Sequence, residues 1–303
     1  MKRRAAVIGR GHEALEDHLS GLLGSSRAEL VAVCDSNPFT LRQRQEQLQV
    51  PGFTRAGQLL DEVAPDFVVV VVPHHAGREV VQECASRGVH VLKEKPFATS
   101  VREARELAQI CQDGQVELMV TLQHRFNPIY SSVAGMLDQI GTPFLIDGQY
   151  TFHTDDPGAG WRGDIRQAGG GCIIDMGYHL IDLLLWYFGL PNRVIAEFST
   201  IAVPGGGYDA EDTAVIQFGY DDGLYGSVLL SRWVAPKTES LHVVGTRGSV
   251  LLTKGQVQRL DPLREEAGIT AETWRPLGLD GESPGLPPAH VAPPRSSRKP
   301  LYL

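Results

Sequence analysis

A strand, a glycine turn, a helix and a second strand are expected within the first 35 residues. The apolar run Ala5 to Ile8 leads directly into Gly9-x-Gly11-x-x-Ala14, leucines follow at helical spacing, and a second apolar run ends at Asp35. Two glycines permit a tight turn and the close approach of a pyrophosphate, and a small third residue permits tight helix packing. This order predicts a dinucleotide-binding unit with the pyrophosphate at the helix N-terminus.

The same stretch predicts which residues contact the dinucleotide. An acid about 20 residues beyond such a turn binds a ribose 2′-hydroxyl, and Asp35 is placed for that role. A carboxylate there repels a 2′-phosphate, so the sequence favours NAD over NADP. The alternatives are an ordinary glycine-containing turn and, for Asp35, a loop residue or the cap of the next helix. The predicted contacts in the turn are Gly9, Arg10, Gly11, His12, Glu13 and Ala14.

Three further apolar runs end in polar residues, as parallel strands do at one edge of a sheet. The first, Phe67 to Val72, is β-branched throughout, which is typical of a central strand buried on both faces. It ends at Pro73-His74-His75, and ligands of open α/β sheets bind beyond the carboxyl ends of the strands. The two histidines are therefore candidate neighbours of the cofactor, although a solvated loop is the simpler interpretation. The other two runs, 89–92 and 116–122, end at Lys93-Glu94-Lys95-Pro96 and at Gln123-His124-Arg125.

The pattern changes near residue 122, which predicts a domain boundary there. Strands linked by turn residues now dominate, and this favours a second domain with a largely antiparallel sheet. Beyond about Pro262 the periodicity is lost, and a stretch rich in Pro, Ser and Gly indicates a poorly ordered tail. The predicted domains are 1–122, 123–262 and 263–303, and the predicted strands of the second are 144–152, 194–203, 213–220, 224–233, 239–244 and 248–253.

One helix is expected in the second domain, between Gly169 and Gly189. Residues three and four apart share a helix face, so Asp175, His179 and Asp182 form one stripe among apolar neighbours. Titratable groups on a buried helix need partners, because an isolated charge there is costly. The alternatives are that Asp175 is the N-cap of the helix and that His179 is a satisfied core histidine.

Composition and net charge limit the kinds of molecule that the protein is expected to bind. A net charge of −8 argues against a nucleic-acid or anionic-membrane surface, and no apolar run reaches the roughly 20 residues of a membrane span. Four widely spaced cysteines suit a reducing cytoplasm better than a disulfide framework or a zinc site, so no metal is expected. A small-molecule substrate is the expected target.

Taken together, the motifs resemble the Gfo/Idh/MocA family of NAD(P)-dependent oxidoreductases over residues 5 to about 255. The resemblance implies an α/β protein, with a Rossmann domain followed by a domain with an open, mostly antiparallel sheet that commonly supports homo-oligomers. The matching motifs are Gly9-x-Gly11-x-x-Ala14, Glu94-Lys95-Pro96, Arg125-Phe126-x-Pro128, Gly169-Gly170-Gly171, Asp175-x-Gly177-x-His179-x-x-Asp182 and Gly245-Thr-x-Gly248.

The resemblance also implies roles for single residues. Lys95, Asp175 and His179 match the usual catalytic set, and the peptide before Pro96 is often cis in the family. Pro73, Glu94 and Lys95 lie at strand ends near the expected cofactor. Two departures stand out: Gly77 lies where the family usually has a histidine, and the chain after Thr253 does not resemble the family.

Oxidation of a secondary alcohol needs a hydride acceptor, a base and a stabiliser of negative charge. The hypothesis assigns His179 as base, Lys95 as the cation at the reacting oxygen and Asp175 as a hydroxyl ligand. The substrate would be a sugar, polyol or inositol-like alcohol. Alternatives are an NAD-dependent glycosidase of the same family and a dinucleotide-binding regulator without activity.

Five further side chains are candidates for binding or structural roles. Trp161, Arg162 and Tyr178 are candidate sugar contacts, because aromatic faces and a guanidinium suit polyols. Arg125 is a candidate ligand of the cofactor or of a substrate oxygen, with an interdomain salt bridge as the alternative. Asp182 is expected to be a structural partner that holds the helix in place.

Overall fold

The computed structural model describes residues 1–9, 14–201, 208–253, 256–260 and 275–276. Contacts divide the chain into two compact units, and the change from the first to the second falls between Thr121 and Leu122. The first unit is Met1–Thr121 with Ile165–Gly169, and the second is Leu122–Asp164 with Gly170–Leu303.

The first unit is built on a parallel sheet of six strands in the order β3-β2-β1-β4-β5-β6. The strand order reverses between β1 and β4, and in such sheets the crevice at the carboxyl ends of these two strands binds the ligand. The predicted Rossmann fold is confirmed. Its strands are β1 (Arg3–Ile8), β2 (Ala28–Cys34), β3 (Gly52–Phe53), β4 (Phe67–Val70), β5 (His90–Glu94) and β6 (Leu118–Thr121).

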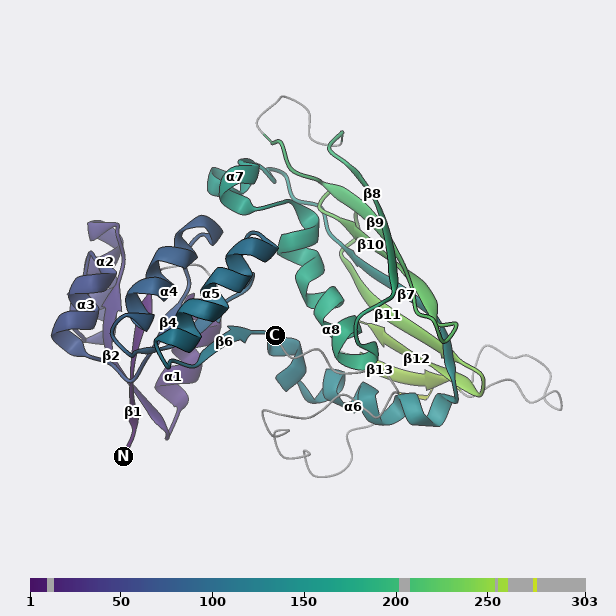
Figure 1. The fold of residues 1–303 in the computed structure, drawn as a ribbon, viewed down its shortest axis with the longest axis horizontal. Coiled ribbons are helices and arrows are strands. Elements are labelled where there is room, and N and C mark those ends of the chain that lie inside the picture. Colours follow the sequence, from purple (N-terminus) through teal and green to yellow (C-terminus); the bar gives the residue numbers. More distant parts are fainter. Residues whose placement is uncertain (10–13, 202–207, 254–255, 261–274, 277–303) are drawn as a thin grey trace. The chain divides into compact units, whose positions relative to one another are not determined.

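Strand β4 shows why the run of valines predicts a central strand. Val68 and Val70 belong to one apolar core, while Val69 and Val71 belong to the other. Successive side chains point to opposite faces of a sheet, so a strand covered on both faces must be apolar at every position. Helices flank this sheet (Figure 1).

The helices of the first unit begin at capping residues where the sequence provides them. Asn37 Oδ1 accepts hydrogen bonds from the backbone of Phe39 and Thr40, so Asn37, and not Asp35, caps α2. Ser100 caps α5 by accepting from the Glu103 backbone. The helices are η1 (Ala14–Leu19), a π-helix, then α1 (Ser20–Gly24), α2 (Pro38–Leu48), α3 (Ala56–Val63), η2 (His74–Ala76), α4 (Gly77–Ala85), α5 (Val101–Asp113) and α7 (Ile165–Ala168).

The second unit contains an eight-stranded sheet in the order β14-β13-β12-β11-β7-β10-β9-β8. Every neighbouring pair is antiparallel except β7 and β10, which run parallel, so the sheet is mixed and mostly antiparallel, as predicted. The strands are β7 (Pro143–Thr151), β8 (Arg193–Ser199), β9 (Thr213–Gly219), β10 (Tyr225–Ser231), β11 (Thr238–Gly245), β12 (Gly248–Thr253), β13 (Gln256–Leu260) and β14 (Arg275–Pro276).

Among the described residues, helices cover one face of this sheet, and no helix covers the other. Helix α8 (Tyr178–Phe188) runs along the covered face (Figure 1), and its Leu180, Leu183 and Tyr187 share a buried core with Ile146 and Leu230 of the sheet. Helix α6 (Pro128–Leu137), begun by the cap Asn127, belongs to the same core and was not predicted. The 3-10 helix η3 (Gln123–Phe126) precedes it.

The structure changes three boundaries expected from sequence. Strand β8 ends at Ser199, short of the predicted Val203, and residues 202–207 lie outside the described part. The predicted helix from Gly169 begins later, as a π-helix η6 (Ile173–Gly177) that continues into α8. The predicted tail lies outside the described residues except Arg275–Pro276, which pairs with β13 as β14.

One segment, Ile165–Phe188, has the length and apolar composition of a membrane span, which corrects the expectation that no run is long enough. The most apolar window of this segment is 44% buried inside the protein, and α8 packs in the core of the second unit. A buried core helix passes the same test, so this is weak evidence for a membrane.

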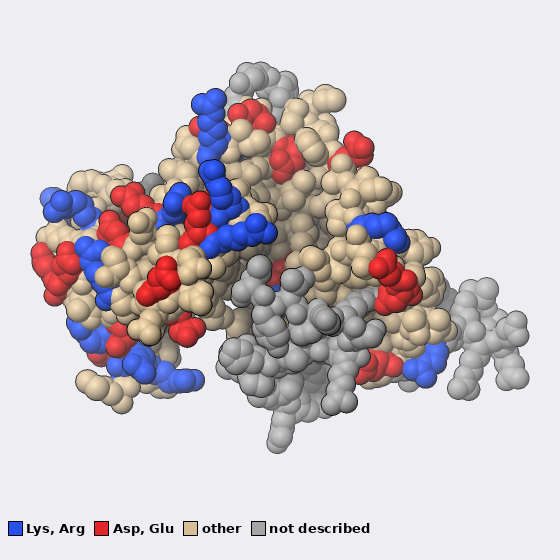
Figure 2. All heavy atoms as spheres, in the orientation of Figure 1, with Lys and Arg blue, Asp and Glu red and all other residues tan. Residues whose placement is uncertain are grey.

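Charges of both signs are interspersed on the face of the first unit that Figure 2 shows. The net charge of −8 is therefore not gathered in one area of that face.

Candidate active site

The carboxyl end of β5 forms a tightly bonded turn that carries Lys95. The peptide between Lys95 and Pro96 is cis, as the resemblance implies. Glu94 accepts hydrogen bonds from Thr121 Oγ1 and His18 Nε2, each at 2.7 Å, and from the Lys95 backbone at 3.1 Å. Burial raises the pKa of Glu94, but the hydrogen bonds of His18 and Thr121 outweigh it and lower that pKa below its ordinary value. Glu94 is thus held as a carboxylate inside the turn.

Lys93 holds this turn through hydrogen bonds, and its side chain occupies the space beside Gly77. Its buried Nζ donates hydrogen bonds to the carbonyl oxygens of Glu94 and Pro96. A Cβ atom on Gly77 would lie 2.6 Å from Lys93 Cε. Burial lowers the pKa of Lys93 to about 8, against the opposing effect of Glu103 and Glu94. A side chain at position 77 would therefore require the buried Lys93 to move.

Gly9, at the carboxyl end of β1, and Asp35, just after β2, each have a feature that fits a bound dinucleotide. Gly9 has a φ of +99°, and a Cβ atom there would lie 2.0 Å from the Val71 carbonyl oxygen, so only glycine fits. Asp35 is buried, and its Oδ1 accepts from the Asn37 backbone at 2.8 Å. Its Oδ2 has no hydrogen-bond partner among the described residues. A buried carboxylate oxygen without a donor fits a ribose hydroxyl.

Several predicted cofactor contacts stay predictions. Arg10, Gly11, His12 and Glu13 lie outside the described residues, and of Ala14 the structure describes only the backbone helix. Pro73 precedes η2 at the end of the β4 segment.

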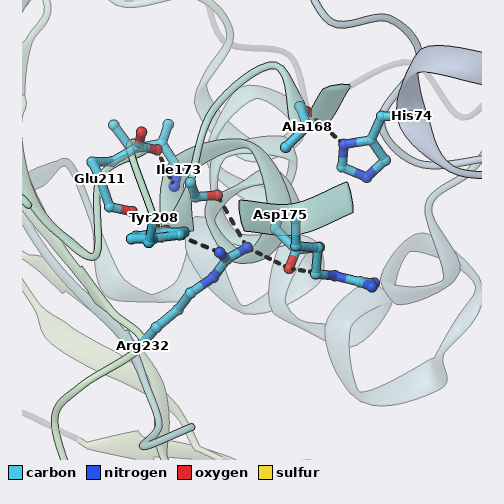
Figure 3. A network of polar contacts seen from close by, with 9 residues as sticks. His74, Ala168, Ile173, Asp175, Tyr208, Glu211 and Arg232 are labelled. Atoms are coloured by element: carbon cyan, nitrogen blue, oxygen red, sulfur yellow. Dashed lines mark hydrogen bonds and ion pairs between the residues drawn. The ribbon is translucent and has the colours of Figure 1, made fainter. Parts of the chain in front are cut away.

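His74 corrects the interpretation of the His74-His75 pair as a solvated loop. Its side chain is buried, and Nδ1 lies 2.7 Å from the carbonyl oxygen of Ala168 (Figure 3). A carbonyl only accepts, so His74 donates and carries its proton on Nδ1. His75 is exposed. The two neighbours point different ways, and His74 holds α7 within the first unit.

In the second unit, Asp175 belongs to a buried ion pair that the sequence did not reveal. Its carboxylate accepts a hydrogen bond from Arg232 Nη2 at 2.6 Å and lies 3.7 Å from Arg162 Nε. Arg232, which is 3% exposed, also donates to Tyr208 Oη at 3.0 Å and to the Gly171 carbonyl (Figure 3). Asp175 lies inside η6, which contradicts the alternative that it caps the helix.

His179 follows Asp175 by one helical turn, at the start of α8, and is buried. Its ring centroid lies 5.0 Å from that of His124 on η3. Tyr178 is half-buried beside it. The helix therefore brings the predicted acid and the predicted base to the same end of the second unit.

Arg125 and Asp182 form a second ion pair within the same unit. Arg125 Nε donates to Asp182 Oδ2 at 2.8 Å, a second nitrogen donates to Oδ1, and the guanidinium lies over the Trp186 ring. Asp182 thus has the structural partner expected for it. The pair is not the interdomain salt bridge considered from sequence, because both residues belong to the second unit. The cofactor role of Arg125 stays a prediction.

Trp161 and Arg162 lie together on the 3-10 helix η5 (Gly160–Gly163). The Arg162 guanidinium stacks 4.4 Å from the centroid of the Trp161 ring. Since Arg162 also approaches Asp175, these two candidate sugar contacts lie beside the predicted catalytic acid.

Within the described residues, no group of three or more His, Cys, Asp or Glu side chains is arranged to hold a metal ion. All four cysteines are buried free thiols.

Comparison with known proteins identifies the family. Residues 3–122 match the model of an oxidoreductase family with an NAD-binding Rossmann fold, and residues 136–251 match the model of the Gfo/Idh/MocA C-terminal domain. The chain belongs to the Gfo/Idh/MocA family. It is an oxidoreductase with an NAD-binding Rossmann domain.

Named relatives and solved structures are similar over most of the chain. A D-apiose dehydrogenase of Paraburkholderia graminis is 28% identical over 82% of this chain and 67% of its own length. A D-xylose 1-dehydrogenase (NADP⁺) of Haloferax volcanii is 26% identical over 74% and 68%, respectively. The WlbA dehydrogenase from Bordetella pertussis, solved with NADH and UDP-GlcNAcA, has a TM-score of 0.78 at 26% identity and covers 84% of this chain and 79% of its own.

Proposed function

We propose that this Gfo/Idh/MocA enzyme oxidises a CH–OH group of a sugar or polyol with NAD. The observation that carries the proposal is the similarity to named sugar dehydrogenases along most of the chain, together with Lys95, Asp175 and His179 at their motif positions. These relatives favour a dehydrogenase over the glycosidase and over the inactive regulator.

The proposed mechanism divides the work between the two domains. When bound, the nicotinamide supplies the hydride acceptor. His179 takes the proton of the reacting hydroxyl, and Lys95 donates a hydrogen bond to the same oxygen, which stabilises the negative charge developing there. Asp175 is paired with Arg232 and lies near Arg162, so its proposed role is to accept a hydrogen bond from a substrate hydroxyl, and the role of base is left to His179.

Trp161, Arg162 and Tyr178 are the proposed contacts for the rest of the sugar. The stacked Trp161–Arg162 pair offers an apolar ring face and guanidinium donors side by side. This combination suits a polyol, which has CH faces and hydroxyl oxygens.

The experiment that tests the function is an assay of NAD reduction with a panel of pentoses, hexoses, glycosides, inositols and linear polyols. We expect one subclass to be oxidised and the Lys95→Ala variant to be strongly impaired on it. The matched control is Lys2→Ala, because Lys2 is exposed at the amino end of β1, the edge of the sheet opposite the crevice. No NADH from any substrate, or equal rates for Lys95→Ala and the parent, would refute the proposal.

The buried Asp35 predicts cofactor preference. Because its free carboxylate oxygen would accept from the ribose and repel a 2′-phosphate, Asp35→Ser should lower kcat/KM with NAD by about 10- to 100-fold, the effect of a lost hydrogen bond to a charged group. Activity with NADP should not fall. Steady-state kinetics with NAD and with NADP measure this preference. The control is Asp66→Ser, because Asp66 is a half-buried acid just before β4, at the amino end of that strand. An unchanged NAD/NADP ratio would show that Asp35 does not bind the ribose.

The open face of the second sheet is the proposed surface for a homo-oligomer. Ile195, Val215 and Tyr225 lie on that face, with Ile195 63% exposed, and it carries a shallow groove of about 420 Å³. An apolar face of this kind indicates an interaction site.

The variant Ile195→Asp should convert the oligomer to monomers, because a charge buried in an apolar interface is costly. Val194→Asp is the matched control, since Val194 is 59% exposed on the same strand and points to the opposite face. Light scattering after gel filtration measures the mass. A parent protein that is already monomeric would exclude the proposed oligomer.

A further inference from the structure

A small cavity, lined by leucines and by several polar side chains, lies beside His179 inside the second unit. Its volume is about 10 Å³, which is close to the room that one water molecule needs. Leucines line the cavity as well, and its titratable groups come from five elements: His124 on η3, Tyr130 on α6, Tyr150 on β7, His179 on α8 and Glu239 on β11. The mechanism above uses only His179 of this set.

The cluster forms a continuous series of contacts from His179 to Glu239. The His124 ring lies 5.0 Å from the His179 ring and is stacked 4.2 Å from the Tyr130 ring. Tyr130 Oη donates to Glu239 Oε1 at 2.6 Å, and His124 Nε2 lies 3.8 Å from the same oxygen. His124 therefore lies between the predicted base and a carboxylate.

Burial differs along this series. His179 is 9% exposed, whereas the Glu239 side chain is 23% exposed and meets solvent. Nδ1 of His124 is buried with no hydrogen-bond partner among the described residues. A buried imidazole nitrogen beside a cavity of this size is placed to bond a water there.

Charges around His124 single out Glu239 as its proton acceptor. Burial lowers the pKa of His124, and the negative charges of Glu239 and Asp182 oppose this. Asp182 is already paired with Arg125, so its charge is compensated. Burial raises the pKa of Tyr130 well above its ordinary value and that of Tyr150 to about 12, so both tyrosines keep their protons. The Tyr130 hydroxyl therefore orients the Glu239 carboxylate and does not accept the proton in its place.

We propose that His124 and Glu239 carry the proton between His179 and solvent during turnover. This rests on the proposed function, in which oxidation of each alcohol releases one hydride to the cofactor and one proton to His179. The proton then passes from His179 through a water in the cavity to Nδ1 of His124. Nε2 of His124 lies 3.8 Å from Glu239 Oε1, so it releases its proton to that carboxylate through a bridging water, and Glu239 passes the proton to bulk water. Each transfer breaks one bond to hydrogen and forms another. His124 gains a proton on Nδ1 and loses one from Nε2, and exchange of these protons with water restores its starting tautomer.

The first test is chemical rescue of Glu239→Gln. The amide oxygen still accepts from Tyr130, so the hydrogen bond at that site is kept while the proton acceptor is lost. We expect kcat to fall about 10²-fold, the lower end of the effect of a positioned acid–base group, and to rise again with the concentration of formate or acetate buffer. The matched control is Glu46→Gln, since Glu46 is exposed on α2 of the first unit. A parent-like kcat, or a deficit that small acids do not restore, would overturn the proposal.

The second test needs no turnover, so it separates this proposal from the proposed function. Nuclear magnetic resonance of ring-labelled histidines, without cofactor, follows the titration of His124 and His179. The Glu239→Gln variant removes a negative charge that raises the pKa of His124, so that pKa should fall further. In His124→Gln, the titration curve of His179 should shift. If neither substitution changes the titration curves of His124 and His179, the proposed coupling is refuted, whether or not a substrate has been found.

Discussion

Replacing His179 by asparagine is expected to lower kcat for the sugar substrate by about 10²- to 10⁴-fold, which is the contribution of a positioned general base. Asparagine is similar in size to an imidazole and keeps a hydrogen-bonding group, but it cannot accept the hydroxyl proton. Because the dinucleotide is held by the first domain, NAD binding measured by fluorescence quenching should change little. Steady-state kinetics with the best substrate of the panel give the result.

The control for this variant is His90→Asn. His90 is exposed at the amino end of β5, the edge away from the crevice, and should tolerate the change. An unfolding transition like that of the parent excludes a collapsed fold. If His179→Asn retains at least half of the parent kcat, then another group is the base.

Replacing Arg232 by methionine is expected to lower the free energy of unfolding by about 3 kcal/mol, the lower end of the effect of removing one partner of a buried ion pair, because Arg162 remains near the Asp175 carboxylate. Arg232 is 3% exposed and donates to Asp175, Tyr208 and Gly171, so its loss removes three hydrogen bonds of the network. Activity should fall as well, since the Asp175 carboxylate loses its orientation. Denaturant unfolding and kinetics measure the two effects.

A double variant separates the two effects. Arg232→Met with Asp175→Asn also removes the charge that has lost its nearest partner, so part of the lost stability should return while activity stays low. Arg232→Lys keeps the charge but not the planar fork, and should lie between the parent and Arg232→Met. Equal stability of the parent and Arg232→Met would mean that this pair does not support the fold.

The sequence alone predicted the structure correctly where a local residue pattern fits only one environment. The valines of β4 predict a strand between two layers because every position meets a core. Gly9 is required by a carbonyl 2.0 Å from the position of its missing Cβ atom, and Asp35 follows at the end of the next strand. The motif at Asp175 and His179 lies within one helical segment, where spacing in sequence translates directly into spacing on a face.

Sequence was insufficient for partners that come from distant parts of the chain. Arg232 meets Asp175 across 57 residues, and Glu239 meets Tyr130 across 109. Arginines and glutamates are common on surfaces, and nothing in their local patterns separates a buried partner from a solvated side chain. His74 was missed for the same reason, since the Ala168 carbonyl is 94 residues away.

By itself, the sequence determined the Rossmann unit, the mostly antiparallel second sheet, the family and the candidate residues Lys95, Asp175 and His179, because periodicity and short motifs are local properties. Only the tertiary structure decided that Asp175 is held by Arg232, that Asp182 is taken by Arg125 and that His124 and Glu239 line a cavity with His179. Burial and charge compensation arise when distant segments meet, and they set which titratable groups stay ionised and which can move a proton.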